Sequence, residues 1–174
     1  VMKLVVEICT KRLRISNFLH SDISEEYVSW LNNRQLMQYS EQRHCQHTVE
    51  SCEDYLQGFK AGDDLFLAIR SHQGELLGSV TVYQDRNNSL VDMGILVGAP
   101  SAQGIGVGKE AWSSVVEWVF GSIRPRKLTA GCMSVNLPMI RLMESVGMQA
   151  DGIRKNHYLW NGEVVDVVYM AKYQ

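Results

Sequence analysis

The sequence predicts a mixed α/β fold in which helices pack on both faces of a largely antiparallel sheet of about seven strands. Three observations support this prediction. Residues 64–98 hold β-rich runs separated by polar turns, residues 107–121 carry apolar side chains at helical spacing, and Asn161-Gly162 separates two further β-rich runs. The chain of 174 residues is 45% hydrophobic, so we expect one domain over residues 1–174.

The first third of the chain predicts edge strands followed by helices. Residues 3–16 alternate loosely, which suggests one or two edge strands. Residues 22–25 form a capping signature for a first helix that ends near residues 32–33. We expect a short helical piece over residues 34–39 and a third helix capped by Thr48.

The remaining elements follow from periodicity and turn signals. We expect strands at residues 64–70, 75–84, 90–98, 128–134, 153–160 and 164–171, a helix from about Val107 to Gly121, and a short helix capped by Asn136.

A glycine-rich loop joins the strand at residues 90–98 to the helix that follows it. Glycines at alternate positions 104, 106 and 108 leave backbone N–H groups accessible and allow a ligand to approach closely. The start of the helix adds about half a positive charge. Together these features predict an anion site suited to a pyrophosphate.

Two common nucleotide loops fit this stretch poorly. A Walker P-loop requires Ser or Thr after Lys109, where Glu110 stands. Gly106-x-Gly108-x-x-Ala111 matches the dinucleotide fingerprint, but several residues separate it from the preceding strand and the next strand ends without a carboxylate.

A third interpretation rests on several motifs in order. Gln103-x-x-Gly106-x-Gly108 matches the acetyl-CoA loop of the GNAT N-acetyltransferase superfamily. Residues 136–148 resemble that family's segment N-x-x-S-I-R-x-x-E-K-x-G-F, and residues 151–166 resemble its closing hairpin. The resemblance covers nearly the whole chain and implies the GNAT fold.

The front half resembles one bacterial subgroup. Residues 30–33, Tyr39, Arg43 and residues 47–48 are similar to the nucleotide-amino-sugar N-acetyltransferases of surface-glycan biosynthesis, of the pseudaminic-acid type, and residues 91–98 fit their A-D-I-G-I-L-I-G strand. Rim-type acetyltransferases and polyamine acetyltransferases are broader relatives. Gln103 replaces a usual Trp, Met139 replaces a Ser and Met148 replaces a Phe, so the sequence departs from the expected pattern at three positions.

The resemblance implies direct acetyl transfer from acetyl-CoA to a primary amine, with no metal. Backbone groups of the loop would hold the CoA pyrophosphate, backbone groups of residues 95–97 would hold the pantetheine arm and acetyl carbonyl, and Asn136 would bond the arm or serve only as a helix cap. The implied cofactor residues are Ile95, Leu96, Val97, Gln103, Gly104, Ile105, Gly106, Val107, Gly108 and Asn136.

Catalytic and acceptor residues are less constrained. Asp92 is the candidate base, acting directly or through a water, although a solvated strand residue is the alternative reading. Asn32, Arg43 and His47 are candidate acceptor residues, and Arg43 suits a diphosphate. Each has a plain alternative: a polar residue at a helix end, a solvated loop charge, and the residue before a cap. The general acid stays open.

Composition narrows the partners. A net charge of −2 and a pI near 6.2 provide no basic field for nucleic acid or an anionic membrane. Four scattered cysteines without a C-x-x-C pair predict a reduced, cytoplasmic protein without zinc. We expect a small-molecule amine acceptor and leave a homodimer open. The alternatives are a protein N-terminus or a polyamine as acceptor, and a non-catalytic acyl-CoA-binding module.

Overall fold

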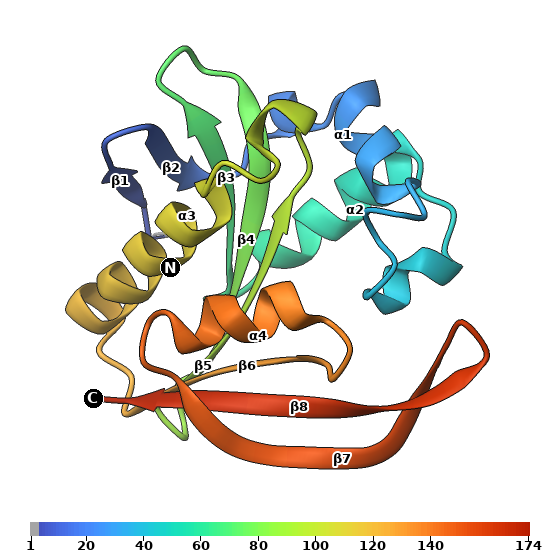
Figure 1. Ribbon diagram of the computed structural model, residues 1–174. Helices are drawn as coiled ribbons and strands as arrows, with labels where there is room; N and C mark the ends of the chain where they lie inside the picture. Colours follow the sequence, from blue (N-terminus) through green and yellow to red (C-terminus); the bar gives the residue numbers. More distant parts are fainter. Residues whose placement is uncertain (1–3) are drawn as a thin grey trace.

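The computed structural model describes residues 4–174, which form an eight-stranded sheet with helices on both faces (Figure 1). Neighbouring strands follow the order β1-β2-β3-β4-β5-β6-β8-β7, and every pair is antiparallel except β5 with β6. The predicted fold class is confirmed. The strands are β1 (Glu7–Cys9), β2 (Leu13–Asn17), β3 (Leu65–Ser71), β4 (Leu76–Asp85), β5 (Leu90–Val97), β6 (Lys127–Met133), β7 (Gln149–Trp160) and β8 (Glu163–Tyr173).

Four α-helices cover the sheet, and side-chain caps start three of them. Ser24, Thr48 and Asn136 each accept a hydrogen bond from an N–H group in the first turn of the helix that follows. The third helix continues as a π-helical turn to Ile123. The helices are α1 (Glu25–Leu31), α2 (Val49–Lys60), α3 (Val107–Trp118) and α4 (Leu137–Glu144).

The helix predicted over residues 34–39 is wrong, because that segment forms turns. The side-chain carbonyl of Asn33 accepts the backbone N–H groups of Gln35 at 3.0 Å and Leu36 at 3.1 Å. Such local bonds give the backbone an alternative to the helical ladder. The chain between α1 and α2 therefore stays irregular, apart from a 3₁₀ turn at Glu41–His44.

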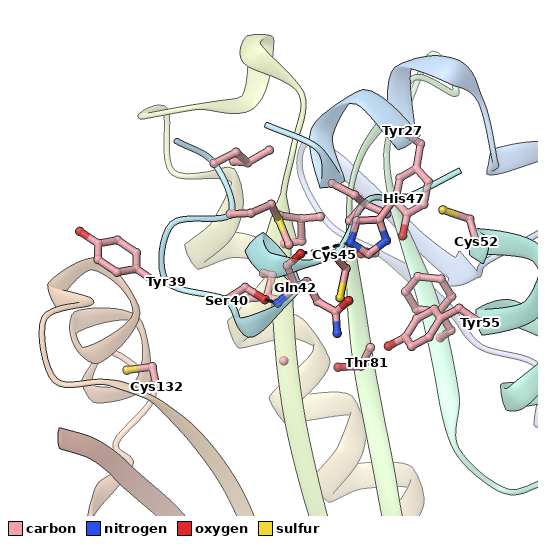
Figure 2. A pocket seen from close by; sticks show the side chains of 18 of the residues that line it. Tyr27, Tyr39, Ser40, Gln42, Cys45, His47, Cys52, Tyr55, Thr81 and Cys132 are labelled. Atoms are coloured by element: carbon pink, nitrogen blue, oxygen red, sulfur yellow. Dashed lines mark hydrogen bonds between the residues drawn. The ribbon is translucent and has the colours of Figure 1, made fainter. Parts of the chain in front are cut away.

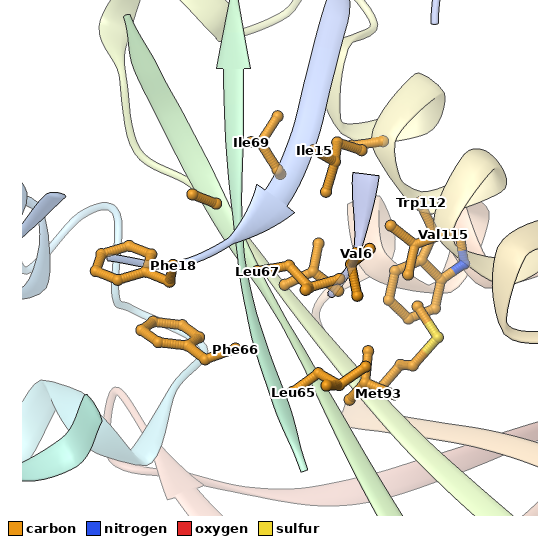
Figure 3. Close-up of a cluster of buried hydrophobic side chains, with 14 of the residues drawn as sticks. Val6, Ile15, Phe18, Leu65, Phe66, Leu67, Ile69, Met93, Trp112 and Val115 are labelled. Carbon is orange, nitrogen blue, oxygen red and sulfur yellow. The ribbon is translucent and has the colours of Figure 1, made fainter. Parts of the chain in front are cut away.

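The core lies on both sides of the sheet (Figure 3). On one side, the ring of Phe66 stacks on Phe18 with centroids 4.3 Å apart and on Phe59 of α2. On the other side, Trp112 of α3 is fully buried beside Met93 of β5. This two-sided burial fixes β3, β4 and β5 as rigid central strands.

A type I′ turn joins β7 to β8, as the sequence predicts. Asn161 and Gly162 have φ values of +52° and +85°, which this turn requires at both positions. The adjacent Trp160 donates its Nε1–H to the carbonyl oxygen of Gln38 at 3.1 Å and stacks on Tyr39, with centroids 5.7 Å apart. The hairpin tip is thereby joined to the irregular segment between α1 and α2.

Candidate active site

A cavity of about 600 Å³ opens between α2, the irregular segment and strands β4 to β6. Figure 2 shows Tyr27, His47 and Tyr55 on one side of it and Tyr39 and Cys132 on the other. Neutral groups dominate the lining, which includes the aromatic residues Tyr27, Tyr39, Tyr55 and Phe66 and the polar residues Ser40, Gln42, Gln46, His47, Ser51, Ser79, Thr81 and Asn136.

The cavity extends into a wedge where β5 and β6 separate. Their parallel pairing ends at Asp92 and Thr129, while β5 continues to Val97 along β4. Gly94 lines the cavity from the β5 side of this wedge, and Gly131 lines it from the β6 side. An extended ligand can therefore enter between β5 and β6, where the two strands are no longer hydrogen-bonded to each other.

The open edge of β5 presents backbone groups to this wedge. The N–H of Gly98 donates to Leu77 of β4 at 3.0 Å, so the alternation of an antiparallel pair directs the N–H and C=O of Ile95 and Val97 away from β4. Gln103 donates its Nε2–H to the Val97 carbonyl at 2.6 Å. Among residues 4–174, the pairing with β6 does not reach Ile95, whose N–H therefore faces the wedge.

Leu96 occupies the alternate position on the same strand. Its backbone groups bond to Ser79 of β4, while Leu96 itself lines the cavity. Of the three residues predicted to offer backbone groups to the pantetheine arm, Ile95 and Val97 have the required orientation, and Leu96 contributes a surface.

The glycine-rich loop follows β5 and ends where α3 begins at Val107. Gly104 and Gly106 have φ values of +73° and +85°, and Gly106 caps the helix without a side chain. Within residues 4–174, the amide groups of residues 104–109 donate to no protein acceptor. Free N–H groups at a helix start favour an anion, so these residues fit a pyrophosphate.

Asp92 lies on the cavity face of β5, two residues before Gly94, but is not among the described residues that line the cavity. Thr129 donates its hydroxyl to Asp92 Oδ2 at 2.6 Å. Partial burial raises the pKa of the Asp92 carboxyl, and the hydrogen bond from Thr129 works against that shift. A raised pKa favours proton transfer nearer neutrality.

Asn136 caps α4 and lines the wedge at the same time. Its Oδ1 accepts the N–H of Met139 at 3.2 Å. Both proposed roles are compatible, because the cap uses Oδ1 and leaves the side-chain NH₂ for a ligand.

Asn32 is hydrogen-bonded to His47, whereas Arg43 lies outside the cavity lining of the described residues. Asn32 accepts the backbone N–H of His47 and donates to its carbonyl, both at 2.9 Å, so Asn32 holds the backbone of a residue that lines the cavity. Arg43 does not line the cavity in the described chain. Its guanidinium donates to the carbonyl oxygen of Leu159 at 2.8 Å and to Glu41 at 2.7 Å.

Several contacts at the site have no sequence signal. The hydroxyls of Tyr55 and Tyr83 are hydrogen-bonded to each other at 3.0 Å, and burial raises the pKa of Tyr55 above its usual range. Arg12 bonds the glycine-rich loop from the turn between β1 and β2. These pairs lie far apart in sequence, and neither pattern nor spacing predicts that they meet.

Two classes of feature are absent from residues 4–174. No helix there has the length and apolar character to span a membrane. No group of three or more His, Cys, Asp or Glu side chains is placed to hold a metal ion.

Comparisons with known proteins agree with this architecture. The chain is 25% identical over 167 residues to the uncharacterized N-acetyltransferase YnaD of Bacillus subtilis (strain 168), which covers 95% of this chain and 96% of that protein. The fold of the present chain is similar to that of spermidine N-acetyltransferase from Vibrio cholerae in complex with CoA and spermine. The TM-score is 0.84 at 19% identity, and the match covers 95% of this chain and 97% of the other.

The fold is also similar to RimL, a ribosomal L7/L12 alpha-N-protein acetyltransferase in complex with coenzyme A, with a TM-score of 0.83, 16% identity and coverage of 97% and 98%. A family model described as acetyltransferase (GNAT) domain matches residues 12–149, which include β2 to α4 and the glycine-rich loop. The chain therefore belongs to the GNAT acetyltransferase family.

Proposed function

We propose that this acetyl-CoA-dependent N-acetyltransferase acetylates a primary amine on a nucleotide-linked amino sugar. The observation that carries the proposal is the neutral, aromatic lining of the cavity beside the wedge. Four tyrosine and phenylalanine rings and several hydroxyl and amide groups suit a sugar and a planar base better than a polycation.

A polyamine acceptor would require carboxylates that converge on the cavity. Glu25, Glu26, Glu41 and Glu50 could supply them by their place in the sequence, but none of these four lines the cavity in the described chain. Glu41 pairs with Arg43 instead. The charge of spermidine would therefore find no partner among these four, which argues against this acceptor.

The chain's own groups supply the steps of acetyl transfer. Acetyl-CoA provides a thioester whose carbonyl oxygen gains negative charge when the amine attacks. The N–H of Ile95 faces the wedge and would donate to that oxygen. The amide groups of residues 104–109 would hold the pyrophosphate, and Asn136 would donate its side-chain NH₂ to the pantetheine arm.

The amine arrives protonated and needs a base. Asp92 would take the proton through one water, because it shares the face of Gly94 while lying outside the cavity lining. His47 is the rival base, since it lines the cavity and Asn32 fixes its backbone. A contact between Arg43 and a diphosphate remains a prediction that requires Arg43 to exchange Glu41 for the phosphate.

The test is a panel of acceptors with acetyl-CoA, in which released CoA thiol is measured. A nucleotide-linked amino sugar, spermidine and peptides with free N-termini are compared at equal concentrations. We expect the amino sugar to have the highest kcat/KM, and the variant His47→Gln to raise its KM while His44→Gln does not. Preference for spermidine or a peptide would overturn the proposed acceptor. If none of the amines tested produced thiol release, the non-catalytic binding module would be favoured.

A further inference from the structure

Arg12 lies in the turn between β1 and β2, and its guanidinium holds the glycine-rich loop from outside. Nη1 donates to the carbonyl oxygen of Ile105, 93 residues along the chain, at 2.8 Å. Nε donates to Oε2 of Glu110 in the first turn of α3 at 2.6 Å. One planar group therefore connects the loop to the helix that it starts.

Glu110 is fixed by further donors from the same turn. Its Oε1 accepts the Thr10 hydroxyl at 2.6 Å and the backbone N–H of Arg12 at 3.0 Å. Burial raises the pKa of the Glu110 carboxyl. The hydrogen bonds from Thr10 and Arg12 outweigh burial and hold this pKa below its usual range. The carboxylate is thus ionised and paired, close to the helix start where a phosphate would bind.

The bond to Ile105 determines where the loop directs its amide groups. In a planar trans peptide the C=O and N–H point in opposite directions. Because the Ile105 carbonyl faces Arg12, the N–H of Gly106 faces away from Arg12, toward the open side of the loop. That N–H has no acceptor within residues 4–174, and Gly106 has the positive φ that this arrangement needs.

We propose that Arg12 is a positioning residue for the pyrophosphate of CoA. It orients the peptide between Ile105 and Gly106 so that the amide groups face the phosphates and the carbonyl does not. It also neutralises Glu110, whose charge would otherwise repel the ligand. This role rests on acetyl-CoA being the donor and on its pyrophosphate binding to the loop, as proposed above.

Calorimetric binding of CoA, 3′-dephospho-CoA and pantetheine to Arg12→Ala tests the inference. Arg14→Ala is the matched control, because Arg14 lies two residues away on β2 and pairs only with the exposed Glu7 among the described residues, at 2.9 Å. We expect Arg12→Ala to raise the Kd of CoA and of dephospho-CoA equally, by about tenfold or more, since the lost bonds involve a charged donor. Pantetheine lacks the pyrophosphate, and its Kd should stay unchanged; Arg14→Ala should change none of the three.

Each contrary result has a distinct meaning. An unchanged Kd for CoA would overturn the inference, and so would a loss confined to CoA, which would place Arg12 at the 3′-phosphate. An equal loss for pantetheine would make Arg12 a general structural residue. Full recovery of CoA affinity in Arg12→Ala/Glu110→Gln would overturn the peptide-orienting step, because the Ile105 carbonyl stays unheld there. Failure of the wild-type protein to bind CoA would instead overturn the proposed function.

Discussion

The substitution Gly106→Val tests the anion site directly. Gly106 has φ +85°, a left-handed conformation that costs an L-residue roughly 1–2 kcal/mol and is still less favourable for a β-branched one. An added Cβ would meet only the Nη2 of Arg12, at 3.4 Å, so the fold can accommodate it. In the variant this strain competes with the bond from Arg12 to Ile105, so part of the unliganded population leaves the left-handed conformation and binding must restore it. A cost of about 1–2 kcal/mol raises the Kd of CoA about 5- to 30-fold, before any contact between valine and phosphate is added.

Gly74→Val is the control for backbone strain alone. Gly74 has φ +90° in the turn between β3 and β4, and an added Cβ there has no neighbour within 4 Å. Calorimetry with CoA and denaturant unfolding should be measured on both variants. We expect both to lose unfolding free energy and only Gly106→Val to lose affinity. Affinity within about twofold of wild type, below the calculated range, would show that the phosphates bind elsewhere.

Three further predictions concern the wedge and the acceptor side. Asp92→Asn should lower kcat near neutral pH by at least about tenfold, and the deficit should shrink as pH rises. Because burial raises the pKa of Asp92, the native protein loses stability as pH rises past the pKa that Asp92 has in the unfolded chain, so the variant should unfold no more easily at pH 7. Asn32→Ala should remove two bonds to His47, cost about 1–3 kcal/mol of unfolding free energy and raise only the acceptor KM. Gln103→Ala should raise the acetyl-CoA KM about threefold to tenfold, because Val97 loses its partner, as steady-state kinetics would show.

Local chemistry made much of the fold predictable. Asn161-Gly162 predicts a tight hairpin because both positions need positive φ, and the structure has both. Thr48 and Asn136 predict helix starts because their side chains satisfy free N–H groups, and both act as caps. The irregular segment shows the limit. The short helix expected over residues 34–39 is replaced by turns, in which the Asn33 side chain accepts two backbone N–H groups, and sequence periodicity does not reveal this.

The site depends on contacts that local sequence cannot specify. The glycine-rich loop is visible in the sequence, but its outer support comes from Arg12, and the anchor of Arg43 at Leu159 lies 116 residues away. The extent of the wedge depends on how far β5 pairs with β6, and no local sequence pattern marks Asp92 and Thr129 as the last pair. A polyamine pocket would require the acidic residues near the first two helices to converge, and Glu25, Glu26, Glu41 and Glu50 all lie outside the cavity lining of the described residues.

The contact between the hairpin tip and the irregular segment can form only late in the synthesis of the protein. Gln38 accepts its bond from Trp160, which is 122 residues further along, and the Leu159 partner of Arg43 is 116 residues further along. At about 5–20 residues per second, a ribosome needs roughly 6 to 24 seconds to deliver these partners. During that interval the nascent chain carries part of the cavity wall without the hydrogen bonds that anchor it. The last strands to emerge therefore anchor a segment of the cavity wall that was among the first parts of the chain to be made.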